Sequence, residues 1–265
     1  MKIICLVKFV PEPNKKTNFE VDRTTGNMKR EKLKAILNPE DASALAYALK
    51  MKAENPEIHI EVLSMGPEKI SAALQNLVRL GADRATLLSD RVYQGSDSLA
   101  TSMVLARYLK KQNFDYIFSG TQTIDGATGH IGPQVAELLQ INQFSDVLNV
   151  KEINAETVFF DAAFDQEVLS LQTKTPCLLS MSLEPRMKLG FVRLEDMEKD
   201  VGSQFQILSN EELQLSVDEV GRKGSPTFVR KDIAVVHEKR ESLYVKADET
   251  GIEEVYQFLK EYDYV

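Results

Sequence analysis

The stretch "DYIFSGTQTIDGATGHIGP" (residues 115–133) decides the fold, because it joins an apolar run to a glycine-rich loop and then to a helical pattern. Residues 115–120 have the composition of a buried strand, and residues 129–139 have amphipathic helical spacing. The loop between them lacks the Lys-Ser or Lys-Thr pair of a Walker loop, and its glycines do not follow GxGxxG spacing. This order of elements predicts one βα unit of a parallel sheet.

The same alternation of strand and helix precedes this stretch. Apolar runs predict strands at 3–9, 58–66 and 84–90, and helical patterns occupy 39–55, 67–80 and 97–111. The strand runs are continuously apolar, as expected when both faces of a sheet are covered. Asn38 before Pro39, and Ser96 or Asp97, are predicted helix caps. We therefore expect an α/β fold with an open parallel sheet and helices on both faces, Rossmann-like and suited to adenine nucleotides.

The chain changes character after Ile141. Four short β-rich runs between residues 146 and 182 predict a β-meander or an extension of the sheet. From Glu184 onward the sequence is charged and irregular, residues 221–232 read as a linker, and residues 249–262 form a last amphipathic helix. We predict a nucleotide-binding domain over 1–183 and an arm over 184–265. The arm has little core of its own, so it is expected to dock onto a partner subunit.

Composition excludes several classes of function. The formal net charge is −8, and no dense basic stripe is present, so nucleic acid is not an expected partner. No apolar run reaches the ~20 residues of a membrane span, and no secretory signal is expected. Cys5 and Cys177 lie in apolar, strand-like runs where buried thiols are common. We expect a cytoplasmic protein.

The turns that follow the predicted strands are the candidate binding site. In an open parallel sheet, ligands bind beyond the carboxyl ends of the strands, near the point where strand order reverses. Gly120, Gly126 and Gly129 let backbone N–H groups approach a phosphate, and Thr128 and Asp125 add short polar side chains. The alternative is that these glycines only form a tight turn and cap the helix that follows. Four turn-rich segments at one sheet edge favour a nucleotide.

No other constellation indicates catalysis by the protein's own side chains. His59, His130 and His237 are scattered without a carboxylate or cysteine at ligand spacing, so no metal is predicted. There is no GxSxG elbow of a hydrolase. A binding cleft without an evident acid, base or nucleophile suits a protein whose chemistry is done by a bound cofactor.

Six motifs resemble the β subunit of the electron transfer flavoproteins, over about residues 1–186. They are "LVKFVPEP" (6–13), "LNPEDASALAYALKMK" (37–52), "VLSMGPEK" (62–69), "LVRLGADRATLLSD" (77–90), "GTQTIDGATGHIGP" (120–133) and "LEPR" (183–186). The resemblance implies a heterodimer with a larger alpha subunit. Ordinary members hold AMP in the β cleft and one redox FAD on the alpha subunit.

"SDRVYQGSDSLATS" (89–102) resembles the electron-bifurcating class of this family, which holds FAD where ordinary members hold AMP. Ile131, where ordinary members usually carry threonine, is similar to that class as well. The resemblance implies that NADH gives a hydride to the β flavin. One electron then goes to ferredoxin or flavodoxin, and the other goes through the alpha-subunit FAD to a flavin-dependent dehydrogenase.

The resemblance also implies the contacts of the cofactor. The adenine and ribose are expected at Leu6, Asn38, Asp41, Met65 and Gly66. The pyrophosphate is expected at Gly120, Gln122, Asp125, Gly126, Thr128 and Gly129. Asp97 and Thr101 are expected on the flavin side.

The sequence departs from the family pattern at residues 187–200. "MKLGFVRLEDMEKD" has acidic residues where family members that dock an acyl-CoA dehydrogenase carry lysines. The sequence therefore leaves open the docking of a different dehydrogenase. Two other functions stay open. One is an ordinary electron transfer flavoprotein β subunit with AMP in the cleft. The other is an adenine-nucleotide-binding regulatory module like the universal stress proteins, which would not need the long arm. The cofactors of the purified heterodimer distinguish these readings.

Overall fold

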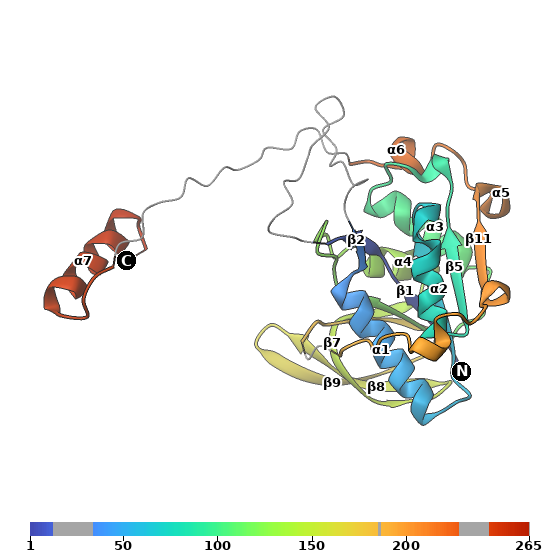
Figure 1. Ribbon diagram of the computed structural model, residues 1–265, viewed down its shortest axis with the longest axis horizontal. Coiled ribbons are helices and arrows are strands. Elements are labelled where there is room, and N and C mark those ends of the chain that lie inside the picture. The colour runs from blue at the N-terminus through green and yellow to red at the C-terminus, as the bar shows by residue number, and fades with distance from the viewer. Residues whose placement is uncertain (13–33, 185–186, 228–243, 265) are drawn as a thin grey trace. The chain divides into compact units, whose positions relative to one another are not determined.

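The computed structural model describes residues 1–12, 34–184, 187–227 and 244–264. The chain divides into two compact units, residues 1–230 and 231–265, which are described separately. Within the described residues, the first unit holds a nine-stranded sheet (Figure 1). The second unit holds α7 (Glu249–Glu261).

The sheet of the first unit is mostly parallel. Its strands, in spatial order, are β11 (Phe205–Leu208), β5 (Arg84–Leu88), β4 (His59–Met65), β1 (Lys2–Leu6), β6 (Tyr116–Gly120), β10 (Cys177–Met181), β7 (Asn142–Ile153), β8 (Thr157–Phe164) and β9 (Glu167–Lys174). The pairs from β11 to β7 are parallel, and β7, β8 and β9 pair antiparallel. The chain builds outward from β1 to β4 and β5, then returns to β6 on the other side of β1. Strand order therefore reverses between β1 and β6.

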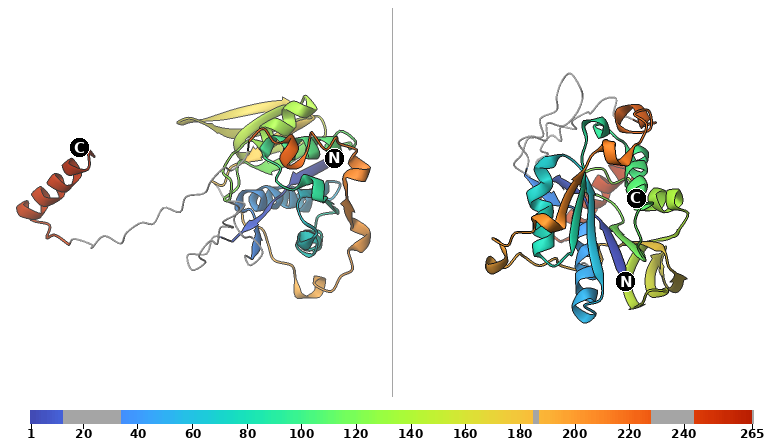
Figure 2. Two further views of the ribbon diagram at one scale, coloured as in Figure 1. Left: turned by 90° about the horizontal axis from the view of Figure 1, so that it is seen from above. Right: turned by 90° about the vertical axis from the view of Figure 1, so that its right-hand side faces the viewer.

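Helices cover both faces of this sheet (Figure 2). They are α1 (Pro39–Glu54), α2 (Ser71–Arg79), α3 (Ser98–Leu109) and α4 (Ile131–Leu139). Side chains of α1 and α2 pack in one core cluster, and those of α3 and α4 pack in the other. Alternate residues of β1 supply both clusters: Ile3 and Cys5 point into the first, Ile4 and Leu6 into the second. This confirms the predicted α/β class with helices on both faces of a sheet.

The helix starts differ in how they are capped. Asp97 caps α3, because its carboxylate accepts a hydrogen bond from the Ala100 N–H at 3.0 Å. Asn38 precedes α1, but its side chain makes no cap hydrogen bond there. Asn38 is the N-cap residue of α1 and Pro39 begins the helix, as expected, but the cap does not use the Asn38 side chain. Its amide group is used elsewhere, at the candidate site.

The stretch expected to form one arm from residue 184 onward is divided in the structure. Residues up to 230 belong to the first unit, because β11 pairs in parallel with β5 at the edge of the sheet. The short helices that follow are α5 (Asn210–Leu213) and α6 (Gly221–Gly224). Pro185 and Arg186 of the "LEPR" motif, and residues 228–232 of the expected linker, lie outside the described residues.

The remaining elements are short. The hairpin of β2 (Phe9–Pro11) and β3 (Ala35–Leu37) is antiparallel. Single 3-10 turns occur at η2 (Glu68–Ile70), η3 (Arg91–Tyr93), η4 (Leu194–Asp196) and η5 (Gly202–Gln204). No helix in the described part of the chain is long and apolar enough to cross a membrane.

A buried polar network joins β11 to the rest of the sheet. The Glu61 carboxylate on β4, 1% exposed, accepts hydrogen bonds from the Tyr108 and Thr86 hydroxyls and pairs with Lys2 Nζ at 2.7 Å. Burial alone would raise the pKa of Glu61, but the Lys2 and Tyr108 contacts outweigh it, so the pKa is lowered. The Gln206 amide on β11 donates to Thr86 at 3.0 Å. The network therefore ties β11 to its neighbour β5 and, through Thr86, to β4.

Both cysteines are fully buried in the sheet. Cys5 lies on β1 and Cys177 on β10, and neither forms a disulfide. Burial raises the pKa of each thiol, which disfavours the reactive thiolate. The expectation that they are buried is confirmed.

Tyr108→Phe tests the network. The substitution removes one buried hydrogen bond to Glu61 while keeping the ring, so we expect the free energy of unfolding to fall by about 1–2 kcal/mol. Urea unfolding followed by circular dichroism measures the change. Tyr244→Phe, at a tyrosine that is 92% exposed, is the matched control and should unfold like the wild type. Equal midpoints for all three proteins would show that the network adds nothing to stability.

Candidate functional site

A cleft of about 480 Å³ lies at the carboxyl ends of the strands, where strand order reverses between β1 and β6. It is lined by residues from the turns after β1, β4, β5 and β6, among them Val7, Gly66, Gly95 and Gly126. All four turns singled out in the sequence therefore border one continuous space. This position and size are those of a ligand site in an open α/β sheet.

The first turn of α1 holds two of these turns in place. The buried Asp41 carboxylate accepts hydrogen bonds from the Lys8 N–H after β1 at 2.9 Å and from the Gly120 N–H at the end of β6 at 3.0 Å. Glu40 accepts from the Gln122 N–H at 2.6 Å. Asn38 donates to the Gln122 carbonyl at 2.8 Å and accepts from the Ile124 N–H at 3.2 Å. Three polar side chains at this helix start, those of Asn38, Glu40 and Asp41, thus fix the backbone of the 120–124 segment.

The environment of Asp41 shifts its ionisation. Burial raises its pKa from 3.8 to about 7, although the hydrogen bonds from Lys8, Gly120 and Asn38 act in the opposite direction. The neighbouring Glu40 carboxylate adds a smaller raising effect. Asp41 is therefore close to half-ionised near neutral pH.

Glycines in the loop after β6 have two distinct roles. A Cβ at Gly120 would lie 2.6 Å from Asp41 Oδ1, and one at Gly132 would lie 2.6 Å from Ser180 Oγ, so both positions need close packing. Gly129 has φ +65°, a conformation that favours glycine. At Gly126 an added Cβ would lie 3.7 Å from Thr123 Oγ1, an ordinary van der Waals distance, so this position is not tightly packed. The loop is packed against the sheet on one side and open toward the cleft on the other.

The two helix starts at the cleft differ in their free donors. α4 follows His130, and no side chain caps it. The N–H groups of Ile131 and Gly132 in its first turn therefore have no partner within the helix. At α3 the Asp97 carboxylate already caps the first turn. The open start of α4 fits a phosphate or pyrophosphate group, since both its donors and its dipole favour an anion.

An ion pair crosses the cleft. Lys8 Nζ lies 2.7 Å from Asp125 Oδ1 and 2.9 Å from Asp125 Oδ2, which ties the turn after β1 to the loop after β6. The Lys8 side chain is 43% exposed and lines the cleft. Its charge is largely balanced by Asp125, so its main effect is to hold the two turns together.

Of the thirteen residues expected at the cofactor, eleven line this cleft. They are Leu6, Asp41, Met65, Gly66, Asp97, Thr101, Gly120, Gln122, Gly126, Thr128 and Gly129. Asn38 and Asp125 do not line it. Asn38 is buried behind the loop, and Asp125 faces Lys8. Contact of the eleven with a cofactor stays a prediction.

Lys8, Glu40 and Tyr93 are among the residues of this site that were not expected at the cofactor. Lys8 and Glu40 act through the contacts described above, and Tyr93 lines the wall beside Asp97. Lys8 lies in "LVKFVPEP" and Tyr93 in "SDRVYQGSDSLATS", so both were inside recognised motifs. Glu40 follows Pro39 at the start of a helix, where an acidic residue has an ordinary role. Nothing local signals that it binds a loop 82 residues away.

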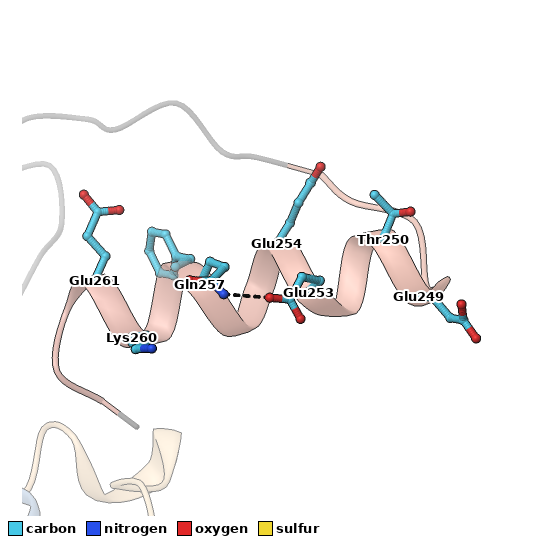
Figure 3. A pocket seen from close by; sticks show the side chains of 8 residues that line it. Glu249, Thr250, Glu253, Glu254, Gln257, Lys260 and Glu261 are labelled. Atoms are coloured by element: carbon cyan, nitrogen blue, oxygen red, sulfur yellow. Dashed lines mark hydrogen bonds between the residues drawn. The ribbon is translucent and has the colours of Figure 1, made fainter.

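A second hollow of about 930 Å³ runs along α7 in the other unit (Figure 3). It is lined by side chains of this one helix, including Glu249, Glu253, Glu254 and Glu261. One helix cannot enclose a ligand, and its carboxylates repel an anion. Within the described residues, no group of three or more His, Cys, Asp or Glu side chains could hold a metal ion.

Gly120→Ala tests the packing of the loop. The added Cβ would meet the backbone of α1, which cannot move aside cheaply, so we expect a loss of about 1–3 kcal/mol in unfolding free energy. Gly190→Ala is the control, because nothing lies within 4 Å of its added Cβ. Thermal denaturation of both variants measures the effect. Equal melting temperatures would contradict close packing at Gly120.

Asp41→Asn tests the ionisation of Asp41. The folded protein holds a proton on Asp41 up to pH about 7, whereas the unfolded chain releases it near 3.8. Between these values the folded state binds more protons, so this group's contribution to stability falls as pH rises. We expect the difference in unfolding free energy, wild type minus Asp41→Asn, to decline from pH 4 to pH 7. Asp165→Asn, at an exposed turn, should leave the pH dependence unchanged. Parallel curves for wild type and Asp41→Asn would contradict the raised pKa.

Comparison with known proteins assigns this chain to a family. The electron transfer flavoprotein domain matches residues 25–188. The chain is 36% identical over 234 residues to the electron transfer flavoprotein subunit beta of Clostridium acetobutylicum, with 87% of each chain covered. It is 37% identical over 235 residues to the caffeyl-CoA reductase-Etf complex subunit CarD of Acetobacterium woodii, with 86% of each covered. It is 32% identical over 238 residues to the acryloyl-CoA reductase electron transfer subunit gamma of Anaerotignum propionicum, with 87% of each covered. The chain therefore belongs to the electron transfer flavoprotein family, among the relatives of its beta subunits.

Proposed function

We propose that this chain is the beta subunit of a heterodimeric, electron-bifurcating electron transfer flavoprotein with FAD in its cleft. NADH supplies a hydride to this flavin. One electron passes to ferredoxin or flavodoxin, and the other passes through an FAD on the alpha subunit to a flavin-dependent dehydrogenase. The flavin supplies the redox chemistry, and the protein supplies binding, orientation and electrostatics. One observation carries the proposal: all four strand-end turns line one cleft.

The extent of the cleft favours a dinucleotide over AMP. The turns after β1 and β4 suit an adenosine, and the open start of α4 suits phosphate groups. The cleft continues beyond them to a wall formed by Tyr93, Gly95, Asp97 and Thr101. AMP would use only the first part, whereas a ribityl chain and ring also need the second.

The residues of the cleft suit binding rather than proton transfer. The Asp41 carboxylate accepts two backbone N–H groups, and the Asp97 carboxylate accepts hydrogen bonds on both oxygens. Thr128, Gly129 and the first turn of α4 offer donors to the pyrophosphate. Lys8 also lines the cleft, paired with Asp125. These groups hold and orient the cofactor and shape the potential around it.

The names of the relatives support a role in a reductase complex. Two of them are named as subunits of caffeyl-CoA reductase-Etf and acryloyl-CoA reductase assemblies. In this chain, Phe191 and Leu194 are 95% and 86% exposed within segment 187–200, which carries both acidic and basic residues. Such side chains suit the docking of a dehydrogenase partner. The mixed charge around them favours a dehydrogenase other than one that reads a lysine-rich segment.

α7 supports the presence of the alpha subunit. Ile252, Val255, Tyr256 and Phe258 are between 45% and 66% exposed, so the helix's own unit leaves its apolar side chains uncovered. An amphipathic helix of this kind is stable mainly when another surface covers it. We propose that the alpha subunit is that surface.

Cofactor analysis of the purified heterodimer tests the function. Acid-released nucleotides should comprise two FAD per heterodimer and no AMP, and stoichiometric NADH should bleach the flavin absorbance anaerobically. One FAD with one AMP, and no bleaching by NADH, would identify an ordinary electron transfer flavoprotein instead. A colourless protein would leave only nucleotide binding of a regulatory kind. NADPH is the control donor for the bleaching.

A further inference from the structure

The segment Val220–Thr227, here called the strap, lies against the turn Tyr93–Asp97 that forms one wall of the cleft. The strap includes α6 and is the last described stretch before the second unit, which begins at Lys231. It belongs to the first unit. Gly95, Ser96 and Asp97 of the turn line the cleft, whereas no residue of the strap does. The strap therefore touches the site only through this turn.

Backbone contacts hold the strap closely against the turn. The Arg222 N–H donates to the Gln94 carbonyl at 3.1 Å, and the Gly221 N–H donates to Ser96 Oγ at 3.0 Å. Gly221 has φ +61°, and a Cβ there would overlap the Val92 carbonyl oxygen. Only glycine suits a position so close to the turn.

Two hydroxyl side chains complete the attachment. Ser225 Oγ accepts from the Asp97 N–H at 2.8 Å and donates to the Gly221 carbonyl at 2.7 Å. Thr227 donates to Asp97 Oδ2 twice, from its backbone N–H at 3.0 Å and from Oγ1 at 2.7 Å. The other oxygen, Oδ1, caps α3 through Ala100. Partial burial would raise the pKa of Asp97, but the Thr227 and Ala100 hydrogen bonds lower it overall, which keeps the acceptor charged.

An apolar contact anchors the start of the strap. Val220 is 1% exposed and packs in the same core cluster as Tyr93 and Leu213. The strap is thus joined to the turn by a buried side chain at one end and by a charged hydrogen-bond acceptor at the other.

We propose that Thr227 and Ser225 are positioning residues for the flavin side of the cleft, and that FAD binding is coupled to attachment of the strap. The inference rests on the proposed function, because it requires an occupant that reaches the 93–97 turn. An FAD that packs on this turn favours the arrangement in which the strap is attached. By linkage, an attached strap favours FAD to the same degree. AMP ends before this wall, so it has no such effect.

Hydrogen exchange of the full-length heterodimer, stripped of its β-cleft ligand, tests the coupling. Saturating FAD should slow amide exchange in both 93–97 and 220–227, whereas AMP should slow exchange in the turns after β1 and β4, the loop after β6 and the start of α4, and leave 220–227 unchanged. Slower exchange at 220–227 with AMP as well would overturn the coupling. FAD binding without any change at 220–227 would overturn it too and leave the proposed function standing. Absence of FAD binding would overturn both.

Thr227→Val is the matched variant, because it removes the hydroxyl and keeps the shape of the side chain. Loss of this hydrogen bond to a charged acceptor should weaken FAD binding about 5- to 10-fold in fluorescence titration and leave AMP binding unchanged. Thr227→Ser should restore the affinity and the spectrum of the bound flavin. Thr157→Val, on β8 and outside the cleft, is the control. Equal weakening of FAD and AMP binding, or no rescue by serine, would mean a general loss of structure and would overturn the positioning role.

Discussion

The cleft depends on one carboxylate at the point where the sheet divides. β1 and β6 are paired from Ile3 and Tyr116 to Cys5 and Phe118, and beyond that pair their chains separate. The N–H groups of Lys8 and Gly120 then lack a partner in the neighbouring strand, and Asp41 accepts both. Buried N–H groups need a hydrogen-bond acceptor. Because Asp41 of α1 accepts both, β1 and β6 can separate without leaving these two donors unsatisfied. The first turn of α1 therefore keeps the crevice between β1 and β6 open.

The two helix starts beside this crevice differ in their free hydrogen-bond donors. α4 presents uncapped donors and suits an anionic group, whereas α3 has its donors occupied by Asp97 and forms a wall. On the proposed function, one open and one closed helix start would suit a dinucleotide, whose charged region lies between its two ring systems. The family shown by sequence comparison is one in which chemistry belongs to a flavin, and the side chains of this cleft are consistent with such a role.

Much of the fold could be predicted from local pattern. The apolar runs and helix boundaries before residue 140 correspond to β1, β4, β5, β6 and the four long helices, because periodicity reports burial directly. β11 was overlooked, since "FQIL" is too short to signal a strand and forms only by pairing with β5 far away in sequence. The candidate site was placed by its glycines and turns. The destinations of the Asn38, Glu40 and Asp97 side chains could not be predicted, because each binds a segment more than 80 residues distant.

The uncapped start of α4 links the stability of the folded subunit to its ligand. Lys8 is paired with Asp125, so its charge is offset, whereas no side chain caps the positive end of this helix, which borders the cleft. A ligand that binds only the folded chain stabilises it by mass action, so newly made subunits compete for the cellular pool of that ligand. On the proposed function, copies without the cofactor would unfold more often and be degraded first, so the supply of cofactor would set how much of the subunit persists.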